Sequence, residues 1–318
     1  HPPAQPGDGG GRGHRRTSDR RARLHLMIAG LDHVALVVRD LDQAVDAYTR
    51  LLGRACNWIG AEGGVRQAWF QLPNMALDLI SPDGEGGFGA AIAAHLDAHG
   101  EGVWALAFTT PDIAGAAALL RRRGIGASDP GSIRTVHADG RKRYWTTSSL
   151  DPETTAGLSL LLAAPPRDGQ PWPLSEATHG EAAAVSALDH VVIHTPNPDR
   201  ALAIYGAKLG LDLRLDRSNP DWGARQLFFR CGETLVEIGA SLKTPVSDAP
   251  DRFGGLAWRV DDPAAVHTRL AADGWDVSDL RRGRKPGTQV FTVRAGAPGL
   301  PALMIQQSAP PAPSETDR

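Results

Sequence analysis

Cysteine is scarce in this chain, since only Cys56 and Cys231 occur among 318 residues. Two cysteines cannot build a disulfide framework or a cysteine-ligated zinc site, and they favour a reducing cytoplasm. No apolar run reaches the roughly 18 residues that a membrane span needs. An excess of charge of one sign is also absent, because the formal net charge is -2. We therefore expect neither a nucleic-acid nor a membrane partner.

The composition is typical of a soluble globular protein, with 42% apolar and 22% charged residues, and the length suffices for two domains with proper cores. Residues 1–26 differ in kind: they begin with His1, are rich in Pro, Gly and Arg, and lack a signal-peptide apolar region. We expect a disordered basic tail there, with Met27 as the true start, or alternatively a basic arm for an acidic partner. A second disordered tail is expected over residues 308–318.

The chain contains an internal repeat. The run Leu31–Val34 (LDHV) recurs as Leu188–Val191, and each run continues as an apolar strand followed by helical spacing of apolar residues. Beyond the helix, VRQAWF at 65–70 corresponds to ARQLFF at 224–229, and MALDLI at 75–80 corresponds to TLVEIG at 234–239. Each copy therefore predicts the order strand, helix, strand, strand, strand.

A weaker unit of the same kind follows each copy. Residues 103–109 and 256–260 predict strands, and Asp112 and Asp262 begin helices after them. We name the four units A1, B1, A2 and B2 in chain order. Residues 27–163 and 187–307 then form two domains, and the Pro- and Gly-rich residues 164–186 form a linker. The stretch 84–89 predicts a loop between A1 and B1.

Four βαβββ units, with Asp-His-Val in the first strand and a carboxylate in the fourth, resemble the vicinal oxygen chelate superfamily. This group includes glyoxalase I, the extradiol dioxygenases, and the bleomycin and fosfomycin resistance proteins. The resemblance covers residues 28–307. It implies an α+β fold in which units pair, so that eight strands curve around a cleft, and two such half-barrel clefts are expected here. The sequence leaves open which A unit pairs with which B unit.

The resemblance also implies a divalent metal (Zn, Fe, Mn or Ni) held by residues of the first and fourth strands. In the A units these residues are His33 and Asp78, and His190 and Glu237. Imidazole and carboxylate groups suit such metals. In the B units the matching positions fall on Ala105 and Ser159, and on Gly255 and Met304, none of which is a good ligand. A metal would need a further ligand, several waters or a chelating substrate.

Each candidate has a structural alternative. The histidines could bond only to backbone, and the carboxylates could form buried ion pairs with Arg66 or Arg225. In Arg66-Gln67 and Arg225-Gln226 neighbouring side chains face opposite ways, so one of each pair should point into the cleft, where arginine could hold a substrate carboxylate or phosphate. The alternative is a solvated strand face. Further anion-binding candidates, or plain solvated turns, are Arg141, Arg284 and Lys285.

These features lead to the hypothesis of a glyoxalase-like lyase or isomerase acting on a small oxygen-rich molecule. A metal would polarise vicinal oxygens, while Glu237 or Asp78 moves a proton. The second copy is the preferred site because glutamate reaches further than aspartate. An extradiol dioxygenase is disfavoured because unit B2 lacks ligands. The alternative hypothesis is a metal-free protein of the bleomycin-resistance kind that sequesters a small ligand, and a homodimer is also open.

Overall fold

The computed structural model describes residues 27–84, 86–165, 172–283, 287–295, 297–298 and 300–306. The expected tails and the candidates Arg284 and Lys285 lie outside these residues. Unit A1 consists of β1 (Gly30–Val37), α2 (Leu41–Leu52), β2 (Trp58–Glu62), β3 (Val65–Gln71) and β4 (Ala76–Pro82). Unit B1 consists of β5 (Gly102–Thr109), α4 (Ile113–Arg122), β6 (Gly131–Val136), β7 (Lys142–Leu150) and β8 (Ser159–Ala163). Both have the predicted βαβββ order.

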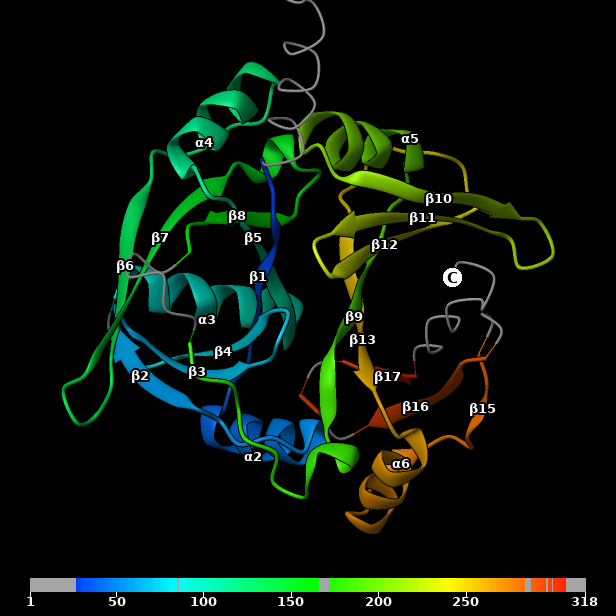
Figure 1. The fold of residues 1–318 in the computed structure, drawn as a ribbon. Coiled ribbons are helices and arrows are strands. Elements are labelled where there is room, and N and C mark those ends of the chain that lie inside the picture. Colours follow the sequence, from blue (N-terminus) through cyan, green and yellow to red (C-terminus); the bar gives the residue numbers. More distant parts are fainter. Residues whose placement is uncertain are drawn as a thin grey trace, which may run out of the picture.

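A1 and B1 pair with each other and form a closed barrel, which answers the question of pairing that the sequence left open. The strand order is β1-β4-β3-β2-β6-β7-β8-β5. Strands β1 and β5 run antiparallel along most of their length. At the opposite seam, β2 and β6 are joined by a single residue pair, Ala61 and Val136. The expected curved half-barrel therefore closes completely in the first domain (Figure 1).

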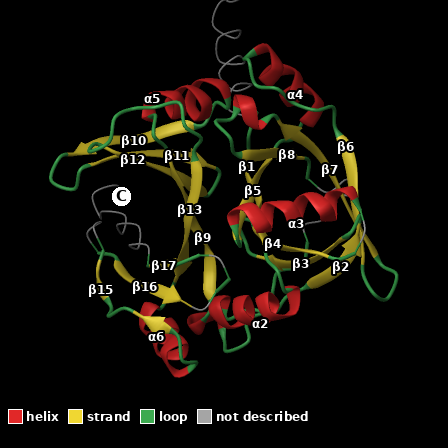
Figure 2. Cartoon of the chain, turned by 180° about the vertical axis from the view of Figure 1, so that it is seen from behind, coloured by secondary structure: helices red, strands yellow, loops and turns green. Residues whose placement is uncertain are grey.

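A helix that the sequence did not predict, α3 (Gly87–His99), lies across the barrel (Figures 1 and 2). Its side chains Ile92 and Leu96 pack against Ala35, Val37 and Ile80 in the lumen. The expectation of a loop over 84–89 is wrong from Gly87 onward. The glycines hide the helix start, because its N-cap is Gly86 and no side chain caps it.

A2 and B2 form the second domain. A2 consists of β9 (Val185–His194), α5 (Pro198–Ala201) with its π-helical continuation η3 (Leu202–Lys208), β10 (Asp212–Asn219), β11 (Ala224–Cys231) and β12 (Thr234–Ser241). B2 consists of β13 (Arg252–Val260), α6 (Pro263–Ala272), β14 (Asp276–Val277), β15 (Arg281–Arg282), β16 (Gln289–Ala295) and β17 (Ala302–Ile305). The sheet runs from β10 to β14 and stays open between these edges. In the described residues β15, the strand of B2 at the place of β6, pairs with β16 and not with β10.

The main core lies on the outer faces of the two sheets, between them and beneath the helices. It includes Val34 and Leu36 of β1, Tyr48 of α2, and Val191 and Trp258 of the second domain. Since side chains alternate along a strand, burial of Val34 and Leu36 in this core turns the intervening β1 positions toward the lumen. Within the described residues, no helix is long and apolar enough to cross a membrane.

Residues 172–183 of the linker pack against A1, and Arg54 anchors them. Buried Arg54 donates to the carbonyl oxygens of Val185 at 2.6 Å and Ser175 at 2.9 Å, and forms an ion pair with Glu181. We expect Arg54→Met to lower the free energy of unfolding by about 2–4 kcal/mol, because two buried carbonyls lose their donor. Urea denaturation measures this loss.

The matched control for Arg54 is Arg294→Met, which removes an exposed ion pair with Asp276. Its expected effect is within about 1 kcal/mol. Equal effects of the two substitutions would contradict the anchoring role of Arg54.

Candidate functional site

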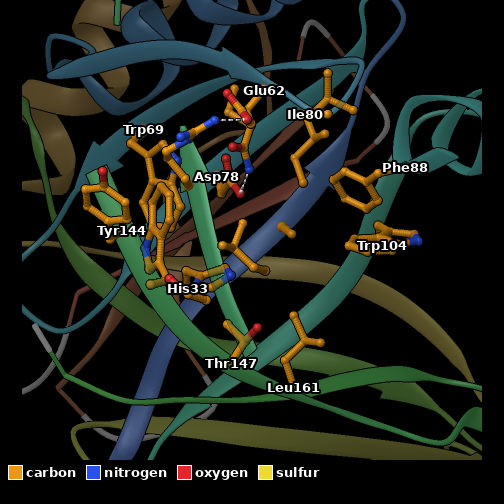
Figure 3. Close-up of a pocket in the computed structure, with 18 of the residues that line it drawn as sticks. His33, Glu62, Trp69, Asp78, Ile80, Phe88, Trp104, Tyr144, Thr147 and Leu161 are labelled. Atoms are coloured by element: carbon orange, nitrogen blue, oxygen red, sulfur yellow. Dashed lines mark hydrogen bonds and ion pairs between the residues drawn. The ribbon is translucent and has the colours of Figure 1, made fainter. Parts of the chain in front are cut away.

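A cavity of about 670 Å³ occupies the lumen of the A1–B1 barrel. Strand alternation turns His33 of β1, Gln67 and Trp69 of β3, and Asp78 of β4 into it (Figure 3). The sequence placed His33 and Asp78 on the first and fourth strands of one unit. The fold brings both to the wall of a single cavity.

Asp78 is the most perturbed group of this cavity. Its side chain is buried, with 2% of the residue exposed. Gln67 Nε2 donates to Oδ2 at 3.1 Å, whereas Oδ1 has no hydrogen-bond partner in the described structure. Burial raises the pKa of Asp78 to about 7, although His33, Arg143 and Gln67 oppose this rise. The carboxyl group therefore exchanges a proton near neutral pH.

His33 is oriented by its neighbour in sequence. Its Nδ1 lies 2.7 Å from Asp32 Oδ1, and its ring meets Trp69 edge-on with ring centres 5.0 Å apart. In the neutral imidazole this hydrogen bond places the proton on Nδ1 and leaves Nε2 as an acceptor. His33 thus enters the cavity with a defined ring orientation.

Aromatic side chains form two walls of the cavity. Trp69 and Trp145 stack with ring centres 4.8 Å apart, and Phe88 and Trp104 lie 5.6 Å apart. In Figure 3 Trp69 and Tyr144 lie on one side of the site, and Phe88 and Trp104 on the other. We refer to Trp69 with Trp145 as the tryptophan wall, and to Phe88 with Trp104 as the α3 wall.

Arg143 braces the tryptophan wall, a role that sequence reasoning missed. Only 1% of the residue is exposed, and its guanidinium carbon lies 4.4 Å from the ring centre of Trp69 and 3.7 Å from that of Trp172. Burial lowers its pKa to about 10, which still leaves a cation at neutral pH. The basic stretch resembled a solvated turn. The signal that could have identified it is the period of two along β7, which places Arg143 on the same face of the strand as Trp145 and Thr147.

The strand register shows which B1 residue takes the place of His33. His33 lies opposite Ala107, and Ala35 lies opposite Ala105. These reciprocal pairs relate β1 and β5 by a local two-fold axis that exchanges His33 with Ala105. The structure therefore places an alanine methyl group at the position where the resemblance implies a third ligand.

The prediction of which B1 residue corresponds to Asp78 on the fourth strand was wrong. Asp78 lies opposite Ala35, the second residue after His33. The second residue after Ala105 lies opposite Leu161. Leu161, rather than the expected Ser159, therefore corresponds to Asp78, and it lines the cavity.

In B2 the strand register likewise changes which residue corresponds to Glu237 on the fourth strand. Leu303 lies opposite Ala257, the second residue after Gly255. Met304 is fully buried in the main core on the other face of the sheet, because neighbouring residues of a strand point in opposite directions. Leu303 therefore replaces Met304 at the fourth position, and both B units carry leucine there.

The second copy holds its histidine in a closed network. His190 Nδ1 lies 2.8 Å from Asp189 Oδ1, and Nε2 lies 3.2 Å from Glu237 Oε2. Gln226 donates to the other oxygen of Glu237 at 2.7 Å. Burial by itself lowers the pKa of His190, but the hydrogen bonds to Asp189 and Glu237 outweigh it and raise the pKa to about 9. At neutral pH an imidazolium is thus paired between two carboxylates.

A cleft of about 810 Å³ lies beside this network. Gln226 and Glu237 line one part of it, and His194 and Arg252 another. Since Glu237 already accepts from Gln226 and pairs with His190, the groups that the sequence favoured as the better site are engaged with each other.

The predicted arginines lie away from the cavities. Arg66 pairs with Asp42 of α2 at 2.8 Å on the outside of the barrel. Arg225 pairs with Asp199 at 2.9 Å and with Asp216. Gln67 and Gln226 are therefore the inward members of the two Arg-Gln pairs, and each bonds to the carboxylate of its own unit.

Arg141 lies exposed in the hairpin between β6 and β7. It pairs with Asp139 at 2.7 Å and lies over the ring of Trp58. It does not line the barrel cavity.

Comparison with known proteins assigns the fold to a family. The model of the glyoxalase/bleomycin resistance protein/dioxygenase superfamily matches residues 32–144 and again residues 189–292. The chain belongs to this superfamily. The two matches coincide with the two copies of the internal repeat.

One known protein is similar to a third of the chain in sequence, and two solved structures are similar to most of it in fold. Ethylmalonyl-CoA/methylmalonyl-CoA epimerase of Cereibacter sphaeroides is 32% identical over 113 residues, 33% of this chain and 80% of the epimerase. A mutant 4-hydroxymandelate synthase from Streptomyces coelicolor has a TM-score of 0.66 at 14% identity, covering 89% of this chain and 94% of its own. The Mn(II)-bound glyoxalase from Novosphingobium aromaticivorans has a TM-score of 0.58 at 16% identity, covering 89% and 83%. The two structures show the shared fold.

The donor set of this superfamily member does not fit a resident metal. Each domain offers one imidazole and one carboxylate, and leucine together with alanine or glycine takes the other positions. No group of three His, Cys, Asp or Glu side chains that could hold a metal occurs in the described part of the chain. Zinc sites in enzymes have three protein ligands and an open position.

Proposed function

We propose that the barrel cavity is the working site, and that the chain is an isomerase-type enzyme which moves a proton on a small carbonyl compound with Asp78 as the base. One observation carries this proposal. Asp78 is fully enclosed at the cavity wall with Oδ1 unpaired, and its pKa lies near 7. Leaving a buried carboxyl oxygen unpaired is costly, and such groups cluster at functional sites.

The proposed chemistry is proton transfer next to a carbonyl group. The Asp78 carboxylate takes a proton from the carbon beside the carbonyl, and the electron pair of the broken C–H bond moves to the carbonyl oxygen as an enolate. Return of the proton from Asp78 to the same face of that carbon regenerates the substrate, whereas its delivery to the opposite face, once the enolate has turned in the cavity, gives the isomer. Neither outcome changes the number of electrons. The hydroxyls of Thr147 and Ser149 also line the cavity and supply donors for the enolate oxygen.

Two further observations support the proposal. The apolar walls lower the local dielectric constant, which strengthens hydrogen bonds to a developing charge. A relative that is 32% identical over 113 residues is named an epimerase, an enzyme of the isomerase class. The first copy is preferred over the second because His190 and Glu237 are engaged with each other.

Proton exchange in heavy water tests the function without knowledge of the natural substrate. Proton NMR would follow loss of the carbon-bound protons of 2-butanone and phenylacetone. We expect the protein to accelerate exchange of at least one of them over buffer, and Asp46→Asn, an exposed change on α2, to leave the rate unchanged. Absence of acceleration with either ketone would overturn the proposal.

Metal analysis forms a separate test. We expect purified protein to contain no stoichiometric Zn, Fe, Mn or Ni, and a chelator to leave exchange unchanged, because no three ligand side chains converge in the described part of the chain. Stoichiometric binding of Zn²⁺ at micromolar concentration that His33→Gln abolishes would instead support the metal-dependent lyase or isomerase.

A second candidate function is ligand binding without chemistry. Ala35, Val65, Ile80 and Leu161 line the cavity beside the two aromatic walls, and apolar lining favours sequestration of a hydrophobic compound. This function predicts saturable binding of a ketone without proton exchange.

A further inference from the structure

We infer that the barrel cavity selects a substrate with a flat, uncharged aromatic ring, held between the tryptophan wall and the α3 wall with its carbonyl group toward Asp78. The inference rests on the proposed function for the role of the carbonyl group. It adds the substrate class to the proposed function. The affinity of the cavity for such a ring can be measured without any turnover.

The tryptophan wall is supported by Arg143 before any ligand binds. Arg143 and Trp172 pack behind Trp69, while Trp145 stacks on it with an angle of 25° between the ring planes. Fully buried Arg143 has little freedom to move, so the indoles keep their orientation. A wall that is already ordered costs little conformational entropy when a ligand packs against it.

The α3 wall supplies the second aromatic surface and an entrance. Trp104 of β5 and Phe88 of α3 both line the cavity, and Phe88 is 38% exposed. We infer that a ring held between the two walls meets aromatic groups on both sides, in the stacked or edge-on geometries that aromatic pairs prefer. This wall depends on the helix inserted between A1 and B1, so it is specific to the first domain of the described structure.

Apolar residues stand in B1 at the two positions where the superfamily resemblance implies metal ligands, and they favour binding of a ring over binding of a polar group. Leu161 lines the cavity at the position that corresponds to Asp78, and buried Ala105 packs in the same apolar cluster as Ile80. These residues would leave a charged or hydrated group without partners. Apart from the hydroxyls of Thr147 and Ser149, which are the proposed donors to the enolate oxygen, the polar atoms deep in the lumen belong to His33, Gln67 and Asp78, and the aromatic walls supply the apolar surface for a ring.

The charge at the mouth is already compensated. Glu62 of β2 and Arg134 of β6 line the outer part of the cavity and form an ion pair with each other. Neither group is left to neutralise a charged ring substituent. An uncharged aryl group is therefore preferred over a charged one.

Calorimetric titration with a matched pair of ketones tests the inference. Phenylacetone and cyclohexylacetone carry the same carbonyl group on rings of similar size, one flat and one puckered. We expect phenylacetone to bind about tenfold more tightly, the factor that stacking against two aromatic surfaces supplies. Equal affinities would overturn the inference.

Variants of the α3 wall separate stacking from hydrophobic contact. Trp104→Leu and, independently, Phe88→Leu should weaken phenylacetone binding about three- to tenfold and change cyclohexylacetone binding less than about twofold. Trp222→Leu, an exposed change in the second domain, should alter neither. Equal weakening of both ketones would count against aromatic selection.

The two proposals can fail separately. Preferential binding of phenylacetone without proton exchange would support the ring selection and overturn the proposed enzyme. Proton exchange of 2-butanone and phenylacetone, with phenylacetone and cyclohexylacetone bound equally, would support the enzyme and overturn the ring selection.

Discussion

Replacement of Asp78 by Asn is expected to abolish proton exchange while making the protein more stable at alkaline pH. The rate should fall at least about a thousandfold, because positioned general bases contribute factors of this size and the amide cannot accept the proton. The amide has the shape of the carboxyl group and retains an oxygen that can accept from Gln67. Proton NMR measures the rate, and equal exchange by wild type and variant would rule out Asp78 as the base.

The stability change of the Asp78 variant follows from proton linkage. The pKa of Asp78 is about 7 in the folded protein, against 3.8 for an aspartate side chain exposed to water. Between these values the folded state binds a proton that the unfolded state does not, so the free energy of unfolding falls as pH rises. The total loss is roughly 4 kcal/mol, complete somewhat above pH 7, and the variant avoids it. Urea denaturation near pH 4 should show similar stabilities, and near pH 8 the variant should be more stable.

Replacement of His190 by Gln is expected to destabilise the protein at neutral pH and to remove a pH dependence at higher values. The pKa of His190 is about 9 in the folded protein, against 6.5 for a histidine side chain exposed to water. Its protonation therefore contributes stability that is complete below pH 6.5 and lost as pH rises through about 9, roughly 3 kcal/mol in all. Partly buried Glu237 also loses its cationic partner in the variant, which adds to the destabilisation.

Denaturation of the His190 variant near pH 6 and near pH 10 measures both effects. The difference from wild type should be large at the lower pH and shrink at the higher one. His179→Gln, an exposed change in the linker, is the matched control and should follow wild type throughout. A variant that keeps the wild-type pH dependence would show that His190 is not charged in the folded state.

The fold could be predicted because the repeat leaves a local signature in each unit. LDHV occurs twice, and apolar residues follow it first at strand and then at helix spacing, so the βαβββ order needs no long-range information. Closure of the first barrel was not predictable in this way. It depends on whether β2 meets β6, whereas the corresponding strand in B2, β15, is described over two residues only and pairs with β16.

Part of the candidate site could be proposed from the sequence. His33 and Asp78 were singled out because a histidine and a carboxylate in apolar strands stand out, yet their protonation and contacts depend on packing. Which residue of each Arg-Gln pair faces inward depends on the orientation of the whole strand. Arg143 was missed because two of the three tryptophans around the buried cation, Trp69 and Trp172, come from distant segments, and local sequence cannot show that they reach it.

The single residue pair between Ala61 and Val136 has a kinetic consequence for the barrel. A seam held by one backbone pair and by the Glu62–Arg134 ion pair separates at a lower free energy than global unfolding, whereas β1 and β5 remain paired along their length. Brief parting of β2 and β6 then gives a molecule in the cavity a second route to solvent, besides the entrance beside Phe88, while the core stays intact. The residence time of a bound compound depends in that case on the seam as well as on the entrance, and its affinity depends on the walls.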